Sequence, residues 1–194
     1  RRLRDGATAR IDNVLVTTIE QTLLDCLCQA SFRHGLAIAD SSLHWNLTDR
    51  DRMERFAAKH GTRRHGIKTA RAVLRYADGR SDNGGESVAR AIMIEEGLML
   101  PELQVEVPDP LQPGAVKVVD FLWRLPCGKT IIGELDGEVK YQGTDRQNPH
   151  GLQSDDLAHA VRVLSDERRR EARLNLTGAT VVRFSYAEAL NAPY

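Results

Sequence analysis

The sequence lacks the features that mark a membrane-bound or exported protein. It has no apolar run approaching the roughly 18 residues of a membrane span, and its start shows no basic segment followed by an apolar one. We therefore expect a cytoplasmic protein with no membrane partner. Cysteine is also scarce. Of its three cysteines, Cys26 and Cys28 lie in an apolar helical stretch rather than at metal-ligand spacing, which favours buried thiols.

Several catalytic signatures are missing as well. We find no Ser or Cys nucleophile motif, no phosphate-cradling glycine loop and no dinucleotide fingerprint. The 27 basic and 27 acidic residues cancel, so any attraction for nucleic acid must come from local patches rather than from a global field. The first residue is Arg1 rather than Met, from which we expect a fragment of a longer protein.

The first 80 residues carry mostly helical patterns. Residues 11 to 16 predict one short strand, and Thr17 with Glu20 predicts a capping box that starts a helix. Further helices are predicted over residues 33 to 45, 48 to 61 and 65 to 77. The turn-rich stretch DGRSDNGG, residues 78 to 85, then predicts a linker. We therefore expect two domains, over residues 1 to 80 and 84 to 194.

The second domain alternates between helical and strand-like patterns. A helix is predicted over residues 85 to 97, strands over 103 to 107, 116 to 123 and 130 to 136, a long helix over 154 to 175, and a last strand over 179 to 185. A short helix ends the chain. The order α-β-β-β-α-β predicts an α/β domain with helices packed on a mixed sheet.

Acidic residues in two of these strands form the candidate site. Asp120 stands in the apolar run VKVVDFLW, where a carboxylate must be paired, protonated or bound to a metal. Glu134 and Asp136 are two apart in TIIGELD, so both side chains leave the same face of the strand. Together these carboxylates suit a hard divalent cation such as Mg²⁺, which keeps positions for water or phosphate. Such an ion can activate water and offset charge on a phosphate.

Each of these residues also has a structural interpretation. Asp136-Gly137 is a common hairpin turn signal, and Asp120 could sit in a structural ion pair. Glu86 lies in the first turn of a predicted helix, where the helix dipole alone favours a carboxylate. Lys140 follows the last acidic residues and could orient an attacking water, although most surface lysines have no such role.

Four segments carry a family resemblance when taken in order: GGESVARAIMIEEGLMLPELQVEV, VVDFLW, GELDGEVKY and DERRREARLNLTGATVVRFSYAEAL. Over about the last 110 residues, the chain resembles actinobacterial proteins of the very-short-patch-repair endonuclease branch of the PD-(D/E)XK superfamily. The resemblance implies a restriction-endonuclease-like core, a DNA substrate and a Mg²⁺ or Mn²⁺ cofactor. It implies Glu86 as the helix glutamate, with Asp120 and Glu134 as metal ligands.

The chain departs from the superfamily pattern at one position. The pattern has a lysine two residues after the glutamate, whereas this sequence has Asp136 there, so Lys140 would act from a displaced position. The leading hypothesis is a metal-dependent DNA endonuclease, with catalytic residues Glu86, Asp120, Glu134 and Lys140. In it, Asp120, Glu134 and Asp136 hold the metal.

The helical part carries a shorter resemblance. NVLVTTIEQTLLDCLCQASFRHGLAIADSSL is similar to the region after the winged helix in AbiEi-type antitoxins, which are transcriptional regulators of type IV toxin-antitoxin systems. This supports an alternative hypothesis, a non-catalytic DNA-binding regulator or antitoxin that uses a degenerate nuclease fold. A purely structural interaction domain is a third hypothesis, and a homodimer is one assembly that the sequence allows.

Overall fold

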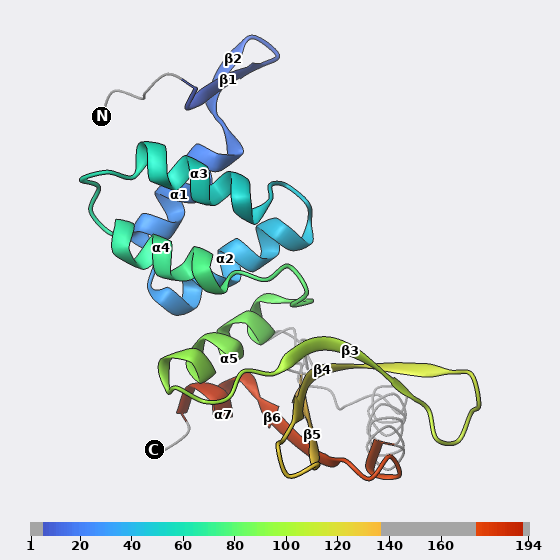
Figure 1. The fold of residues 1–194 in the computed structure, drawn as a ribbon. Coiled ribbons are helices and arrows are strands. Elements are labelled where there is room, and N and C mark those ends of the chain that lie inside the picture. Colours follow the sequence, from blue (N-terminus) through green and yellow to red (C-terminus); the bar gives the residue numbers. More distant parts are fainter. Residues whose placement is uncertain (1–5, 137–173, 192–194) are drawn as a thin grey trace, which may run out of the picture. The chain divides into compact units, whose positions relative to one another are not determined.

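The computed structural model describes residues 6 to 136 and 174 to 191 (Figure 1). The chain divides between Leu100 and Pro101 into two compact units, which we call the helical unit and the sheet unit. This division lies later in the chain than the boundary predicted over residues 78 to 85. The reason is that helix α5, Gly84–Glu95, packs against helix α2, Phe32–His44, and so belongs to the helical unit.

The helical unit begins with a hairpin of strands β1, Thr8–Ile11, and β2, Val14–Thr17. The single strand predicted over residues 11 to 16 is therefore wrong. Asp12 and Asn13 form the turn with φ angles of 47° and 63°, the left-handed region that these two residue types tolerate better than most. The hairpin side chains are largely exposed, Ile11, Val14 and Leu15 among them.

Capping side chains fix where the next helices begin. Helix α1, Ile19–Gln29, starts at Thr18, whose hydroxyl accepts from the Gln21 amide at 3.3 Å, one residue later than the predicted cap at Thr17. Ser31 caps α2, and Asp49 caps α3, Arg50–His60, by accepting from the Arg52 amide at 2.7 Å. Helix α4 spans Ile67–Tyr76. The predicted helices of this region are thus confirmed to within a few residues.

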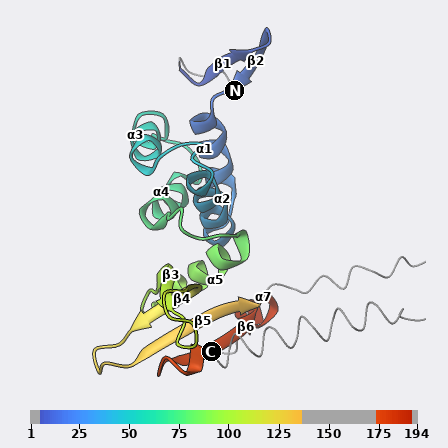
Figure 2. The ribbon, with the colours of Figure 1, turned by 90° about the vertical axis from the view of Figure 1, so that its right-hand side faces the viewer.

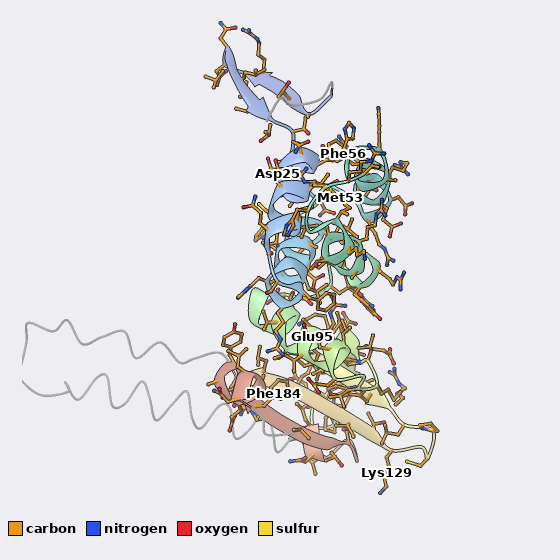
Figure 3. All side chains as sticks on the ribbon, turned by 90° about the vertical axis from the view of Figure 1, so that its left-hand side faces the viewer. Asp25, Met53, Phe56, Glu95, Lys129 and Phe184 are labelled. Atoms are coloured by element: carbon orange, nitrogen blue, oxygen red, sulfur yellow. The ribbon has the colours of Figure 1, made fainter. Side chains whose placement is uncertain are left out.

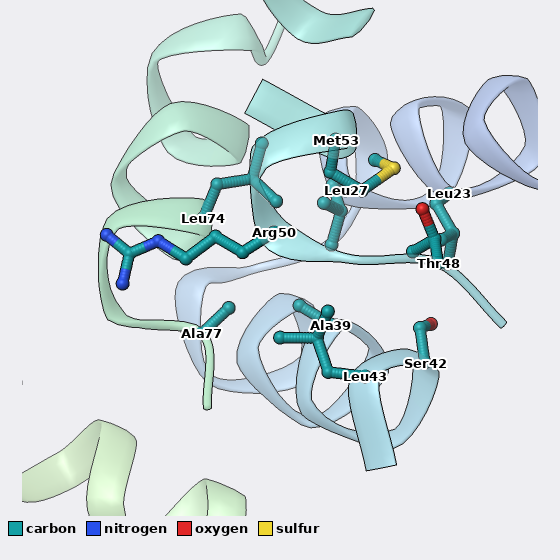
Figure 4. Close-up of a pocket in the computed structure, with 10 residues that line it drawn as sticks. All are labelled: Leu23, Leu27, Ala39, Ser42, Leu43, Thr48, Arg50, Met53, Leu74 and Ala77. Atoms are coloured by element: carbon teal, nitrogen blue, oxygen red, sulfur yellow. The ribbon is translucent and has the colours of Figure 1, made fainter. Parts of the chain in front are cut away.

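Helices α1 to α4 enclose an aliphatic core. Leu24, Leu36, Ala70 and Val73 are fully buried in it. Helices α3 and α4 lie together on one side of α1 and α2 (Figure 2). A small cavity remains inside this core (Figure 4), and most of its lining is aliphatic: Leu23, Leu27, Ala39, Leu43, Met53, Leu74 and Ala77, beside Ser42, Thr48 and Arg50.

A buried ion pair attaches α5 to the rest of the helical unit. The Arg90 guanidinium on α5 donates to Asp40 on α2 at 2.6 Å and to the Tyr76 carbonyl oxygen at 2.7 Å. The Asp78 amide donates to the same Asp40 carboxylate at 2.8 Å. Burial raises the pKa of the Asp40 carboxyl, and the attraction of Arg90 only partly offsets this. The pair therefore fixes α2, α5 and the segment between α4 and α5 together.

The sheet unit contains four strands in the order β3-β4-β5-β6. They span Glu102–Pro108, Val116–Arg124, Thr130–Asp136 and Thr180–Ser185. The first three are antiparallel and β6 is parallel to β5, which confirms the α/β class and the mixed sheet. Helix α7, Tyr186–Asn191, follows β6 and contacts it. Only the last two residues of the helix predicted over 154 to 175 lie within the described ranges.

The core of the sheet unit is smaller than that of the helical unit. Its buried members are Val119, Leu122, Ile132 and Leu174. Phe121 is fully buried as well, and its ring stacks on that of Phe184 at 6.0 Å between centroids. In the residues that the structure describes, no helix has the length and apolar character needed to cross a membrane.

Candidate functional site

The candidate site lies where strands β4 and β5 stop pairing. Their ladder runs from Arg124 opposite Thr130 to Phe121 opposite Gly133. Beyond that pair, β4 continues to pair with β3, and β5 continues to pair with β6. The next residues along the two strands are Asp120 and Glu134. The register, continued by one step, therefore sets two acidic residues opposite each other at the end of the ladder.

At this point the Asp120 carboxylate, rather than the β4 backbone, accepts a hydrogen bond from β5. Its Oδ2 accepts a hydrogen bond from the Leu135 amide at 2.9 Å, and its Oδ1 accepts from Gln104 Nε2 at 3.5 Å. Gln104 on β3 has a φ of 49°, a left-handed conformation that locally interrupts the strand geometry. Asp120 thus satisfies a β5 amide that β4 no longer reaches, and these contacts fix its orientation.

Glu134 is the more buried of the two acids, with 8% of its surface exposed. Its cross-strand partner on β6 is Arg183. The Arg183 guanidinium forms an ion pair with Asp136 at the end of β5. Among the described residues, one cationic side chain and three acidic ones therefore occupy adjacent positions on β4, β5 and β6.

The structure brings together some of the predicted residues but not all. Asp120 and Glu134 lie on neighbouring strands, as expected. Asp136 is the last residue of β5 and is ion-paired with Arg183, whereas Gly137, the second residue of the predicted turn, lies outside the described residues. Within residues 6 to 136 and 174 to 191, no group of three His, Cys, Asp or Glu side chains is arranged to hold a metal ion. Lys140 lies outside the described residues.

Glu86 belongs to the helical unit, where it has local partners. Its carboxylate is buried and accepts from the Asp82 amide at 2.8 Å and from Asn83 Nδ2 at 2.6 Å. Asn83 in turn accepts from the amides of Gly85 and Glu86, at 2.9 Å and 3.1 Å. These contacts form a reciprocal cap at the start of α5. They match the structural interpretation of Glu86, and its catalytic role stays a prediction.

Sequence reasoning missed Gln104 and Arg183, the two neutral or basic residues of the site. Gln104 stands in the strand LQVEV, and Arg183 stands in the strand TVVRFS. A polar residue inside an apolar strand run indicates a candidate site residue, and both runs contain one. What the sequence does not give is the register that sets Arg183 beside Glu134, because β5 and β6 are distant in the chain.

Comparison with known proteins adds two relatives of unknown role. Among the similar proteins are the uncharacterized proteins MT2308 and Rv2248 of Mycobacterium tuberculosis. Each is 36% identical to this chain over 114 residues, which cover 59% of this chain and 41% of the relative. The chain therefore spans about two fifths of the length of these curated relatives. No family model matches the chain, and no solved structure matches it.

Proposed function

We propose that the sheet unit is a metal-dependent nuclease domain that hydrolyses phosphodiester bonds in DNA. The observation that carries this proposal is the position of Asp120 and Glu134 as the first residues past the β4–β5 ladder. A strand pair that ends with two opposed acidic residues offers two carboxylates to one ligand. A divalent cation is the ligand that would offset both. The sheet order β3-β4-β5-β6, antiparallel over its first three strands and parallel between β5 and β6, supports the restriction-endonuclease-like core that the sequence resemblance implies.

The donor set fits Mg²⁺ or Mn²⁺. Two carboxylates suit a hard cation that retains several water or phosphate oxygens, and Asp120 and Glu134 would be its protein ligands. When bound, the ion would activate a water molecule and offset charge on the scissile phosphate. Asp136 fits less well, because it is ion-paired with Arg183. In this proposal Lys140 assists the attacking water.

The residues of the chain itself contribute orientation and charge. The Leu135 amide and the Gln104 side chain hold the Asp120 carboxylate in place, so its position is set before any ligand arrives. Arg183 supplies a guanidinium beside Glu134, a group suited to a phosphate oxygen. Release of Asp136 from Arg183 would free that guanidinium for the substrate.

The test is cleavage of supercoiled plasmid DNA with Mg²⁺ or Mn²⁺. We expect Asp120→Asn and Glu134→Gln each to lower the rate by about a hundredfold or more, the usual size of losing one charge-stabilising group. Glu106→Gln is the matched control, because Glu106 is an exposed glutamate on β3 of the same unit. Calorimetric titration with Mn²⁺ should show weaker binding for the two site variants alone. Equal cleavage by all four proteins would contradict the proposal.

A second function is favoured by one specific observation, the Asp136–Arg183 ion pair. It occupies the position two residues after Glu134, where the superfamily pattern has a lysine. A chain without that lysine could bind DNA without cutting it and act as a transcriptional regulator or antitoxin. This alternative predicts salt-sensitive DNA binding, no cleavage with either metal, and no loss of binding in Glu134→Gln.

One double variant separates these two functions further. Asp136→Lys with Arg183→Gln would restore the superfamily lysine and remove the guanidinium that would repel it. If Asp120 and Glu134 hold a catalytic metal, cleavage by this variant should increase over that of the unmodified chain. A variant that still binds DNA but shows no cleavage would favour the regulator. Arg183→Gln alone is the control for loss of the ion pair.

A further inference from the structure

The positive charge of the helical unit is concentrated in α3, α4 and the segment that joins them. Residues 50 to 75 contain nine arginines and lysines but only two acidic residues, although the chain as a whole has no net charge. Such a segment creates a local positive potential that the overall balance conceals.

The basic residues form two exposed rows. On α3 they recur at i, i+3 and i+7, and on α4 they repeat the same spacing, so each row follows one face of its helix. The residues are Arg52, Arg55 and Lys59 on α3, and Lys68, Arg71 and Arg75 on α4. The opposite faces are buried through Met53 and Ala57 on α3, and through Ala70 and Val73 on α4. Nitrogen-tipped side chains extend outward from both helices in Figure 3.

Most of this charge is not neutralised within the described part of the chain. Arg52 pairs with Glu20 at 2.6 Å. The other five residues of the two rows have no carboxylate within ion-pair distance among the described residues. The α3 row also borders a hollow in the surface, whose lining includes Phe56, His60 and Thr18. An anionic partner can therefore approach five cations that no carboxylate of the described residues pairs with.

We propose that these two rows, which we call the α3–α4 basic surface, bind the phosphate backbone of double-stranded DNA. Each row covers eight residues, or seven helical steps, and so about 10 Å of helix. Phosphates recur about every 3.4 Å along the axis for each strand, so one row matches about three of them. Helices α3 and α4 pack against each other, so the two rows lie on neighbouring helices of the same unit.

The composition of the surface favours duplex DNA over two other polyanions. A membrane-surface helix needs large apolar side chains beside its cations, and none of the exposed large hydrophobic residues lies between residues 50 and 76. Single strands are bound by exposed aromatic rings on which bases stack. Here the Phe56 ring is stacked on His60, and the Tyr76 ring is packed edge-on against Phe32. The surface therefore fits charge contacts with the phosphate backbone of duplex DNA best.

This surface does not depend on the proposed hydrolysis, because it uses different residues in the other unit. Binding should therefore be measured on the 194-residue chain in EDTA, where no metal-dependent cleavage can occur. The probe is a fluorescent 30-base-pair duplex, read by anisotropy across a salt series. For the unmodified chain we expect log K to fall with log salt with a slope of about −3.6 to −5.4, as four to six phosphate contacts would give.

The decisive variants remove one row at a time. Lys68→Ala/Arg71→Ala/Arg75→Ala should weaken binding by about tenfold or more and reduce the salt slope by about 3. The matched control, Arg10→Ala/Arg124→Ala/Lys129→Ala, removes the same charge from exposed residues elsewhere, Lys129 among them (Figure 3), and should bind nearly as well as the unmodified chain. Lys68→Arg/Arg71→Lys/Arg75→Lys keeps the charge and should keep the affinity and the slope.

The outcomes separate this proposal from its competitors. Equal loss in the row variant and the control would overturn it, because net charge alone would then explain binding. A slope shallower than −1 in the unmodified chain would overturn it even if the alanine variant lost its helical circular dichroism. Binding to vesicles of anionic phospholipid in place of DNA would assign the surface to a membrane. DNA binding without plasmid cleavage would support the surface and count only against the nuclease proposal.

Discussion

The two units differ in what lies opposite their acidic side chains. In the helical unit, Asp40 faces Arg90 at 2.6 Å, and both side chains are almost completely buried. In the sheet unit, Asp120 and Glu134 stand opposite each other on strands that stop pairing at that point. The first arrangement joins helices. The second places two acidic residues at opposed positions of neighbouring strands, an arrangement found at many sites that bind a ligand.

The units also differ in charge. Residues 1 to 100 contain sixteen Lys and Arg against thirteen Asp and Glu, and residues 101 to 194 contain eleven against fourteen. The zero net charge of the chain is thus the sum of a basic helical unit and an acidic sheet unit. A whole-chain charge is a poor guide to partners when its parts carry opposite excesses.

The largest expected effect breaks the ion pair of the helical unit. Arg90→Met would leave Asp40 buried without its cation, at a cost of about 3 to 5 kcal/mol in the free energy of unfolding. Chemical denaturation measures this. The control is Arg80→Met, since Arg80 pairs with Asp78 at a largely exposed position and should cost less than about 1 kcal/mol. A similar cost for both variants would show that burial of the Asp40–Arg90 pair does not increase its contribution to stability.

The next effect tests how tightly the sheet unit is packed where its ladder ends. A Cβ at Gly133 would lie 2.9 Å from the Trp123 ring and 3.2 Å from the Phe121 Cβ. We expect Gly133→Ala to destabilise by about 1 to 3 kcal/mol through overpacking. In the helical unit, a Cβ at Gly84 meets only the Ala37 Cβ at 3.9 Å, so Gly84→Ala should be close to neutral. Thermal unfolding of both variants checks the contrast, and an unchanged melting temperature for Gly133→Ala would contradict it.

A smaller effect is expected when one acidic side chain in each unit, Glu134 or Asp40, is neutralised. Glu134→Gln removes one of two opposed like charges and should raise the free energy of unfolding by up to about 1 kcal/mol. Asp40→Asn removes the partner of a buried arginine and should lower it. Opposite signs in urea denaturation at neutral pH would support a binding role for the first acid and a packing role for the second. Destabilisation by both would assign Glu134 to packing as well.

The smallest effect is a difference in titration between two acids of the helical unit. Burial raises the pKa of the Asp40 carboxyl above its ordinary value of 3.8. For Asp78, burial acts in the same direction, but hydrogen bonds and attraction from Arg80 outweigh it and lower the pKa below 3.8. Carboxyl carbon shifts followed by NMR from pH 7 to pH 2 should show Asp40 protonating first.

The two shifts have opposite consequences for stability. Folded Asp40 binds its proton more readily than the unfolded chain does, so its contribution is greatest below pH 3.8 and declines as pH rises through its raised pKa. Asp78 contributes stability above pH 3.8, and this is lost as pH falls through its lowered pKa. In Asp78→Asn, the loss of stability below pH 3.8 should be smaller. The reverse order of titration would contradict both assignments.

The sequence predicted those parts of the fold that local patterns determine. The strand-like run TIIGELD predicts a strand over residues 130 to 136, and β5 has the same bounds. The β1–β2 turn was missed because Asp12 and Asn13 stand inside a run that otherwise reads as one strand. The place of α5 depends on Arg90 reaching Asp40, fifty residues earlier, which no local pattern reveals.

The candidate site shows the same limit. Asp120 and Glu134 were identified because each is a carboxylate in an apolar strand, a local anomaly. The pairing of Asp136 with Arg183 depends on a parallel register between distant strands, and Gln104 contributes through an unusual backbone conformation. Sequence reasoning therefore finds the acids of such a site more readily than the residues that orient and balance them.

The hydrogen bond from the Leu135 amide to Asp120 also supplies a reporter. A cation that draws the Asp120 oxygen toward itself must lengthen this bond or polarise it, and either change alters the shielding of that one amide nucleus. The Leu135 cross-peak in a nitrogen-proton correlation spectrum would then move on titration with Mg²⁺, before any substrate is present. The backbone of β5 thus carries a built-in probe of whether the acid on β4 is occupied.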